Sequence, residues 1–214
     1  MPNLKPLERR EFIFDVSAGS NERGNIITGR PIVYGQRTNI GPFDEVIEPG
    51  ALDRTDLRDV RFLVNHNLSM IPLARSRRNN GNSTMQLSPD AEGMTFAANV
   101  DTENNTTSRA LYSAVGRGDL TGMSIMFGVD GEEWEDLESD HPLRRIRSIS
   151  TIVEISAVIF PAYDATTIEA RSKEALDSAR SVLEKARQQR ANPPEGADAT
   201  LKLLKEQSKI LGGF

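Results

Sequence analysis

The sequence predicts a mainly β, α+β domain built from antiparallel strands, followed by a helical tail. Two observations carry this prediction. Short apolar segments with a period of two recur along most of the chain, separated by turns rich in glycine, proline and asparagine. Helical spacing is confined to one short stretch and to the C-terminal region. Because helices do not alternate with the strands, a closed or nearly closed β architecture is favoured over a parallel α/β sheet.

The first strands are expected near the N-terminus. The stretch "EFIFDVSAG" places Phe12, Phe14 and Val16 on one side at period two, and "NIITGRPIVYG" gives a second extended run. The segment "GPFDEVIEPGALDRT" then reads as a turn-rich loop that leads into a short helix over "ALDRTDL". These patterns predict two strands, a loop and one helical turn or more.

Further strands are expected in the middle of the chain. "DVRFLVNHN" has an apolar centre and ends at the asparagine-flanked His66. "MIPLARSRR" and "MQLSPDAEGMTFAANV" add extended segments, and the turn "PDAEG" divides the second into an antiparallel pair.

One short helix separates these strands from the last ones. "NNTTSRALYSAVGRGD" has apolar residues at helical spacing between a start rich in asparagine and threonine and two glycines. Strands follow in "TGMSIMFGVDGEEWEDL" and "RRIRSISTIVEISAVIFP", joined by the exposed loop "EDLESDH".

The C-terminal region has a different pattern. An amphipathic helix is expected in "TTIEARSKEALDSARSVLEKARQQR", and a second, shorter amphipathic run in "LKLLKEQSKILGGF". We therefore divide the chain into a domain at 1–168, with its β core at about 10–165, and a helical tail at 169–214. A proline- and glycine-containing linker lies near 192–198. The helices are expected to pack on their own domain, to self-associate or to bind a partner.

The amino-acid composition and the net charge disfavour several classes of function for this chain. The formal net charge of −5 disfavours nucleic acid as the main partner, and no apolar run has the roughly 20 residues that span a bilayer. The charged N-terminal segment does not resemble a signal peptide, so we expect a soluble, cytoplasmic protein. Without cysteine, and without nucleotide-binding or zinc motifs, neither a cofactor nor a metal site is expected.

Three polar residues lie in or at the end of apolar strands: His66, Ser124 and Glu154. A carboxylate buried among isoleucines and valines needs a partner, and histidine is one candidate. Serine, histidine and an acid can form a nucleophile, its general base and the group that orients the base. Structural roles remain open for each, because Ser124 can bond to a backbone carbonyl and Glu154 can face solvent.

Six segments in order resemble the tailed-phage prohead (capsid-maturation) protease family, from about Arg10 to Ala170. Any single segment is a weak signal, but their order is specific. They are "FDEVIEPGAL", "FLVNHN", "IPLARS", "DAEGMTFAANV", "GDLTGMSIMF" and "RRIRSISTIVEISAVIFPAYDAT".

The resemblance implies a serine protease similar in fold to the herpesvirus assemblin protease, an antiparallel β-barrel surrounded by short helices. By motif position, His66 is the expected general base and Ser124 the nucleophile. Glu154 is the expected third member, which orients His66. Related viral proteases use a second histidine in that role, so His141 is the alternative, although its polar loop favours simple exposure.

The resemblance also implies substrates and a location. The family cleaves scaffold protein, or the scaffold-like segment of the major capsid protein, inside the procapsid in the host cytoplasm, and often cleaves itself. Possible self-association is a further expectation. A non-enzymatic capsid assembly or scaffolding protein is the main alternative, motivated by the amphipathic tail. The hypothesis of a serine esterase is weak, because the Gly-x-Ser-x-Gly motif of those enzymes is absent around Ser124.

Overall fold

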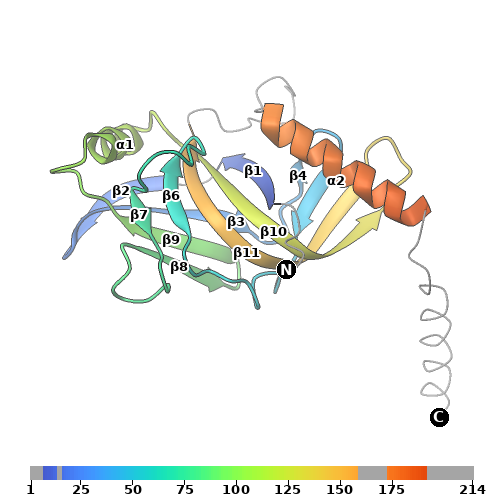
Figure 1. Ribbon diagram of the computed structural model, residues 1–214, viewed down its shortest axis with the longest axis horizontal. Coiled ribbons are helices and arrows are strands. Elements are labelled where there is room, and N and C mark those ends of the chain that lie inside the picture. The colour runs from blue at the N-terminus through green and yellow to red at the C-terminus, as the bar shows by residue number, and fades with distance from the viewer. Residues whose placement is uncertain (1–6, 14–15, 159–172, 192–214) are drawn as a thin grey trace, which may run out of the picture.

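The computed structural model describes residues 7–13, 16–158 and 173–191 of the 214-residue chain. This part forms two β-sheets and two helices, and Figure 1 shows the helices at opposite ends of the molecule. The strands are β1 (Leu7–Ile13), β2 (Val16–Asn21), β3 (Gly24–Val33), β4 (Thr38–Asn39), β5 (Asp44–Ile47), β6 (Arg61–Val64), β7 (Ala74–Arg75), β8 (Met85–Asp90), β9 (Gly93–Asn99), β10 (Gly122–Glu135) and β11 (Leu143–Val158). The helices are α1 (Thr106–Arg117) and α2 (Lys173–Ala191).

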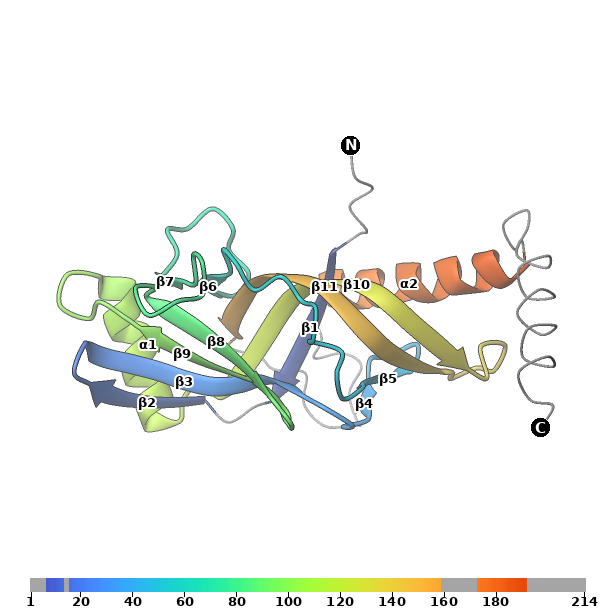
Figure 2. The same ribbon diagram turned by 90° about the horizontal axis from the view of Figure 1, so that it is seen from below.

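The larger sheet is organised around β11. This 16-residue strand pairs antiparallel with β10 along one edge. Along its other edge it pairs in parallel with two short strands, β5 near its start and β6 near its end. Strand β1 pairs antiparallel with β10, and β4 and β7 complete the seven-stranded sheet. Figure 2 shows β10 and β11 side by side as one long curved ribbon.

The smaller sheet has the order β2-β3-β9-β8 and is antiparallel throughout. Its apolar residues and those of the larger sheet form one core, which includes Ile27, Met94, Phe96, Ile125 and Ile155. The expected antiparallel pair around "PDAEG" is confirmed as β8 and β9. The turn residues therefore predicted where this pair of strands is divided.

Helix α1 confirms the helix expected before β10. The Asn105 side chain accepts hydrogen bonds from the backbone N–H groups of Thr107 and Ser108, both at 3.0 Å, and so caps the first turn. Gly118 ends the helix at φ 75°, in the left-handed region that glycine enters without strain. The Tyr112 hydroxyl donates to the Gly19 carbonyl at 2.8 Å, which ties α1 to β2.

Helix α2 packs on the larger sheet. Its buried residues Ala179, Leu183 and Ala186 join Phe43 and Leu137 in a second apolar cluster. The apolar face of the first C-terminal helix is thus covered by the chain's own sheet. The expected linker at 192–198 and the second amphipathic run lie outside the described residues.

Two expectations about the fold are corrected. The described strands do not form a closed antiparallel barrel surrounded by short helices; they form two sheets, with parallel pairing at β11. Apolar periodicity shows which face of a strand is buried, but it does not specify the neighbouring strand or its direction.

The expected helix over "ALDRTDL" is also absent; this segment forms turns. Its local backbone bonds are those of turns, such as Thr55 N–H to the Leu52 carbonyl at 3.1 Å. Others run to β11, since Asp56 N–H donates to the Ser150 carbonyl and Ile149 N–H to the Ala51 carbonyl, both at 2.9 Å. Pairing with a neighbouring strand has outweighed local helix propensity.

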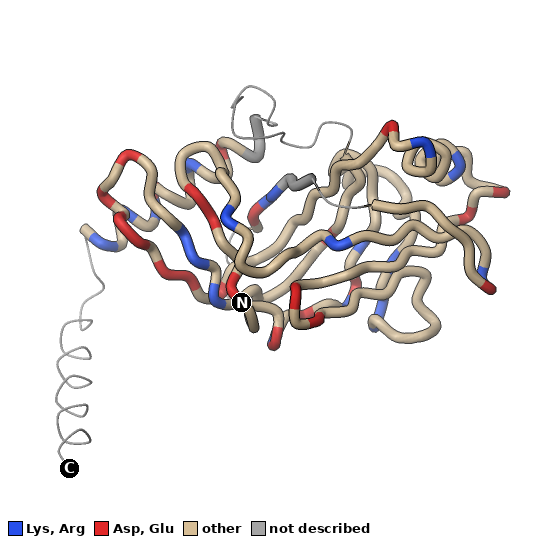
Figure 3. Tube along the Cα trace, turned by 180° about the vertical axis from the view of Figure 1, so that it is seen from behind, with Lys and Arg blue, Asp and Glu red and all other residues tan. Residues whose placement is uncertain are grey.

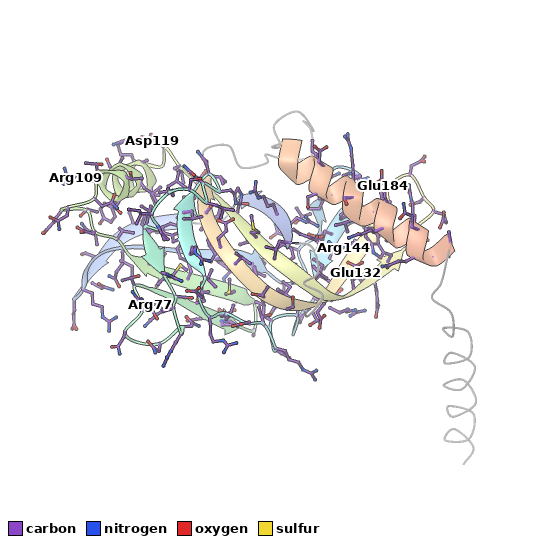
Figure 4. All side chains as sticks on the ribbon, in the orientation of Figure 1. Arg77, Arg109, Asp119, Glu132, Arg144 and Glu184 are labelled. Carbon is purple, nitrogen blue, oxygen red and sulfur yellow. The ribbon has the colours of Figure 1, made fainter. Side chains whose placement is uncertain are left out.

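Four buried charged residues meet beside α2, and a fifth, the exposed Glu132, joins them at the edge. Arg10 donates to Glu45 at 2.6 Å and to Glu8 at 2.6 Å, and Arg144 donates to Glu45 at 2.9 Å and to Glu132 at 2.7 Å. Both arginine side chains are only 1% exposed. Figure 4 labels Arg144 and Glu132 on the two long strands next to α2.

This ion cluster joins β1, β5, β10 and β11 through paired charges, in contrast to the apolar contacts of the main core. Burial alone would raise the pKa of Glu8, but Arg10 and Arg144 outweigh it and the net shift is downward. Exposed pairs continue along the hairpin, and Figure 3 shows acidic and basic stretches side by side where β10 and β11 join.

Arg144→Met should lower the free energy of unfolding by about 3–5 kcal/mol, because it removes one of the two cations that pair with the buried carboxylates of Glu8 and Glu45. The matched control is Arg147→Met, which removes an exposed ion pair with Glu133 and should cost about 0–1 kcal/mol. Urea denaturation of both variants measures the difference. Equal losses would show that the cluster contributes no more than a surface pair.

Candidate active site

Ser124, Glu154 and Ser156 share one face of the larger sheet. Ser124 lies directly opposite Ser156 in the β10–β11 pairing, and Met126 lies opposite Glu154. Since side chains alternate along a strand, these residues point away from the core face that carries Ile125 and Ile155. Directly opposite Cα atoms are about 5 Å apart, so Ser124 and Ser156 are close neighbours.

His66 reaches this face because the chain turns sharply after β6. The Asn65 N–H still donates to the Ala157 carbonyl at 2.9 Å, as a continuation of the parallel pairing. Asn65 and His66 then both have positive φ, 49° and 55°, and the Asn67 N–H closes the turn on Val64 at 3.1 Å. Asparagine and histidine tolerate this conformation better than most residues, which explains the "VNHN" sequence at this position.

His66 and Glu154 form a buried pair. The Nδ1 atom of His66 lies at short hydrogen-bonding distance from Glu154 Oε1, and the two side chains are 7% and 0% exposed. The expectation that the strand carboxylate needs a partner is therefore confirmed, and the partner is His66. On the far side of the ring, Nε2 is buried without a hydrogen-bond partner within the described part of the chain.

Ser124 is fully buried, and its hydroxyl is engaged elsewhere. Its Oγ donates to the Arg10 carbonyl of β1 at 2.8 Å, across the β1–β10 pairing that places Glu11 opposite Ser124. No contact between Ser124 and His66 is found among the hydrogen bonds of residues 7–13, 16–158 and 173–191. The structure thus brings His66 and Glu154 into contact and places Ser124 on the adjoining strand.

His141 lies elsewhere. Its Nε2 atom is 2.8 Å from Asp44 Oδ1, and its side chain is 39% exposed. Burial would raise the pKa of Asp44, but hydrogen bonds from His141 and Arg37 prevail and lower it. His141 precedes β11, whereas Glu154 lies eleven positions beyond Leu143, the first residue of that strand. At the rise of a strand, these eleven positions span about 36 Å along β11.

Ser156 belongs to this site and was missed in the sequence. Its Oγ donates to Glu154 Oε2 at 2.5 Å and accepts the backbone N–H of His66 at 3.1 Å. The signal that identifies it is the period of two along a strand, because a residue two positions after Glu154 shares its face. Neither groups able to hold a metal nor a membrane-spanning helix is found among the described residues.

Comparison with known proteins assigns the chain to a family and finds a distantly similar solved structure. The sequence model of the caudovirus prohead serine protease family matches residues 13–180. No curated protein matches the chain. Among solved structures, the capsid assembly protease of bacteriophage T4 is similar with a TM-score of 0.39 and 11% identity, over 72% of this chain and 99% of that one.

His66→Ala should lower the free energy of unfolding by about 3 kcal/mol, because Glu154 would stay buried without its main partner. Adding Glu154→Gln should recover part of this loss, since the pair is coupled. The control is His141→Ala, which breaks a half-exposed pair and should cost about 0–1 kcal/mol. A double-mutant cycle by urea denaturation checks this, and additive effects of the first two changes would contradict the contact.

Proposed function

Because the chain belongs to the caudovirus prohead serine protease family, we propose that it is a serine endopeptidase that cleaves capsid proteins during phage maturation. The observation that carries the proposal is the buried His66–Glu154 pair. The Nε2 atom of His66 has no hydrogen-bond partner among the described residues, and Ser124 lies opposite Ser156, which binds the His66 backbone. The family supports the reaction class, and the contact between His66 and Glu154 supports the roles proposed for these two residues.

The proposed chemistry begins with Ser124. Its hydroxyl leaves the Arg10 carbonyl and donates to His66 Nε2, which removes the proton as Oγ attacks the scissile carbonyl carbon. Glu154 holds Nδ1–H and stabilises the imidazolium that forms. His66 then protonates the leaving amine, and water, activated by the same histidine, releases the acyl group from Ser124.

The proposed substrates are the scaffold protein or the scaffold-like segment of the major capsid protein, within the procapsid, and the protease itself. The rival hypothesis of a non-enzymatic scaffold was motivated by the amphipathic C-terminal helix. In the described part of that region, the apolar face of α2 is already covered by the chain's own sheet. This removes one reason to assign the chain a purely assembly role.

Ser124→Ala should abolish processing when the chain is produced together with its capsid and scaffold proteins, because alanine has no hydroxyl group to attack the scissile carbonyl carbon. The matched control is Ser150→Ala, which removes a strand hydroxyl that donates only to the Gly128 carbonyl. Gel analysis and intact mass of the capsid proteins report the outcome. Normal cleavage in the Ser124 variant would reject the proposal.

Two further variants identify the third member. Glu154→Gln should reduce processing by about 10⁴-fold, as expected when the residue that orients a catalytic histidine loses its charge. His141→Ala should leave processing unchanged, since His141 pairs with Asp44 at the other end of β11. The opposite result in the same assay would transfer the role to His141.

A further inference from the structure

We propose that Ser156 is a positioning residue that fixes the tautomer and the orientation of His66 through Glu154. This inference rests on the proposed function for its catalytic consequence, but its structural part stands on contacts of the described residues. Ser156 lies on β11, two positions after Glu154, and is fully buried.

The direction of the hydrogen bonds at Ser156 is set by the backbone. The His66 N–H can only donate, so at 3.1 Å it uses a lone pair of Ser156 Oγ. The hydroxyl proton of Ser156 is then directed to Glu154 Oε2, at 2.5 Å, a distance typical of a hydroxyl bonded to a carboxylate. Both hydrogen-bonding functions of this hydroxyl are used within the site.

The same reasoning continues to the imidazole. With one oxygen of Glu154 bound by Ser156, the other faces His66 Nδ1 and accepts its proton. The neutral ring is then protonated on Nδ1, which leaves the lone pair on Nε2, the buried atom without a partner. The backbone N–H of His66 thus determines, through Ser156 and Glu154, which nitrogen of its own ring acts as the base.

Ser156 also holds the turn that carries His66. Asn65 and His66 are consecutive non-glycine residues with positive φ, a conformation that needs support from its surroundings. The bond from His66 N–H to Ser156 Oγ gives this support at the second residue. Position and tautomer of the base are therefore controlled by one hydroxyl group.

Other serines bonded across β10 and β11 do not share this arrangement. Ser124 donates to the Arg10 carbonyl and Ser150 to the Gly128 carbonyl, as strand serines commonly do. Ser156 is different because it donates to a carboxylate that itself contacts a histidine. Ser150 is therefore a control on the same strand that tests the loss of a hydroxyl alone.

The test uses NMR of the full-length protein labelled with ¹⁵N-histidine. The chain has only two histidines, so His66→Ala assigns the signals and His141 is an internal reference. In the wild type, neutral His66 should be protonated almost entirely on Nδ1. Ser156→Ala should give a mixture of the two tautomers, Ser156→Thr should restore the wild-type state, and Ser150→Ala should not change it.

The catalytic consequence is measured as processing of the capsid proteins. Ser156→Ala should slow it about 10- to 100-fold, the effect of removing one hydrogen bond to a charged group, and Ser156→Thr should recover most of the rate. Absence of processing by the wild type would reject the proposed function, while the tautomer measurement would still report on Ser156.

Two results would overturn the inference. One is the finding that neutral His66 of the wild-type protein is protonated on Nε2. This measurement does not depend on the folding of any variant. The other is a folded Ser156→Ala protein with unchanged tautomer and unchanged processing rate.

Discussion

The structure depends on the pairing of β11. This strand contacts β10 along one edge and both β5 and β6 along the other, so it joins segments from distant parts of the chain. Near its start it contributes Arg144 to the buried ion cluster, and near its end it contributes Glu154 and Ser156 to the site. A shift of one residue in its register would turn both groups to the other face of the sheet.

The site joins rigid strands to one strained turn. Glu154, Ser156 and Ser124 are fixed by the sheet, whereas His66 is placed by two residues with positive φ. Side chains on strands hold their positions well, and the turn after β6 brings His66, the proposed base, to the same face. The contact of Ser124 with β1 means that the N-terminal strand, itself held by the ion cluster, helps to fix the position of the Ser124 hydroxyl, the proposed nucleophile.

Much of this arrangement could be predicted from the sequence. Apolar segments and turns predicted many of the strands, capping residues predicted α1, and a buried strand carboxylate predicted a partner for Glu154. The expected face with Phe12 and Val16 was wrong, because these residues belong to β1 and β2 in different sheets. Strand neighbours could not be predicted, which is why a closed barrel was expected and the parallel pairing of β5 and β6 with β11 was missed. The internal partners of Arg10 and Arg144 were missed for the same reason, since a strand arginine shows its burial only when opposing carboxylates are known.

The central claim is that Ser124 is a nucleophile activated by His66. The most direct measurement is reaction of the purified protein with a fluorophosphonate, followed by intact mass and peptide mapping. The account predicts one covalent adduct, on Ser124, and its loss in His66→Ala. An adduct on another serine, or an equal rate of labelling of Ser124 without His66, would contradict it.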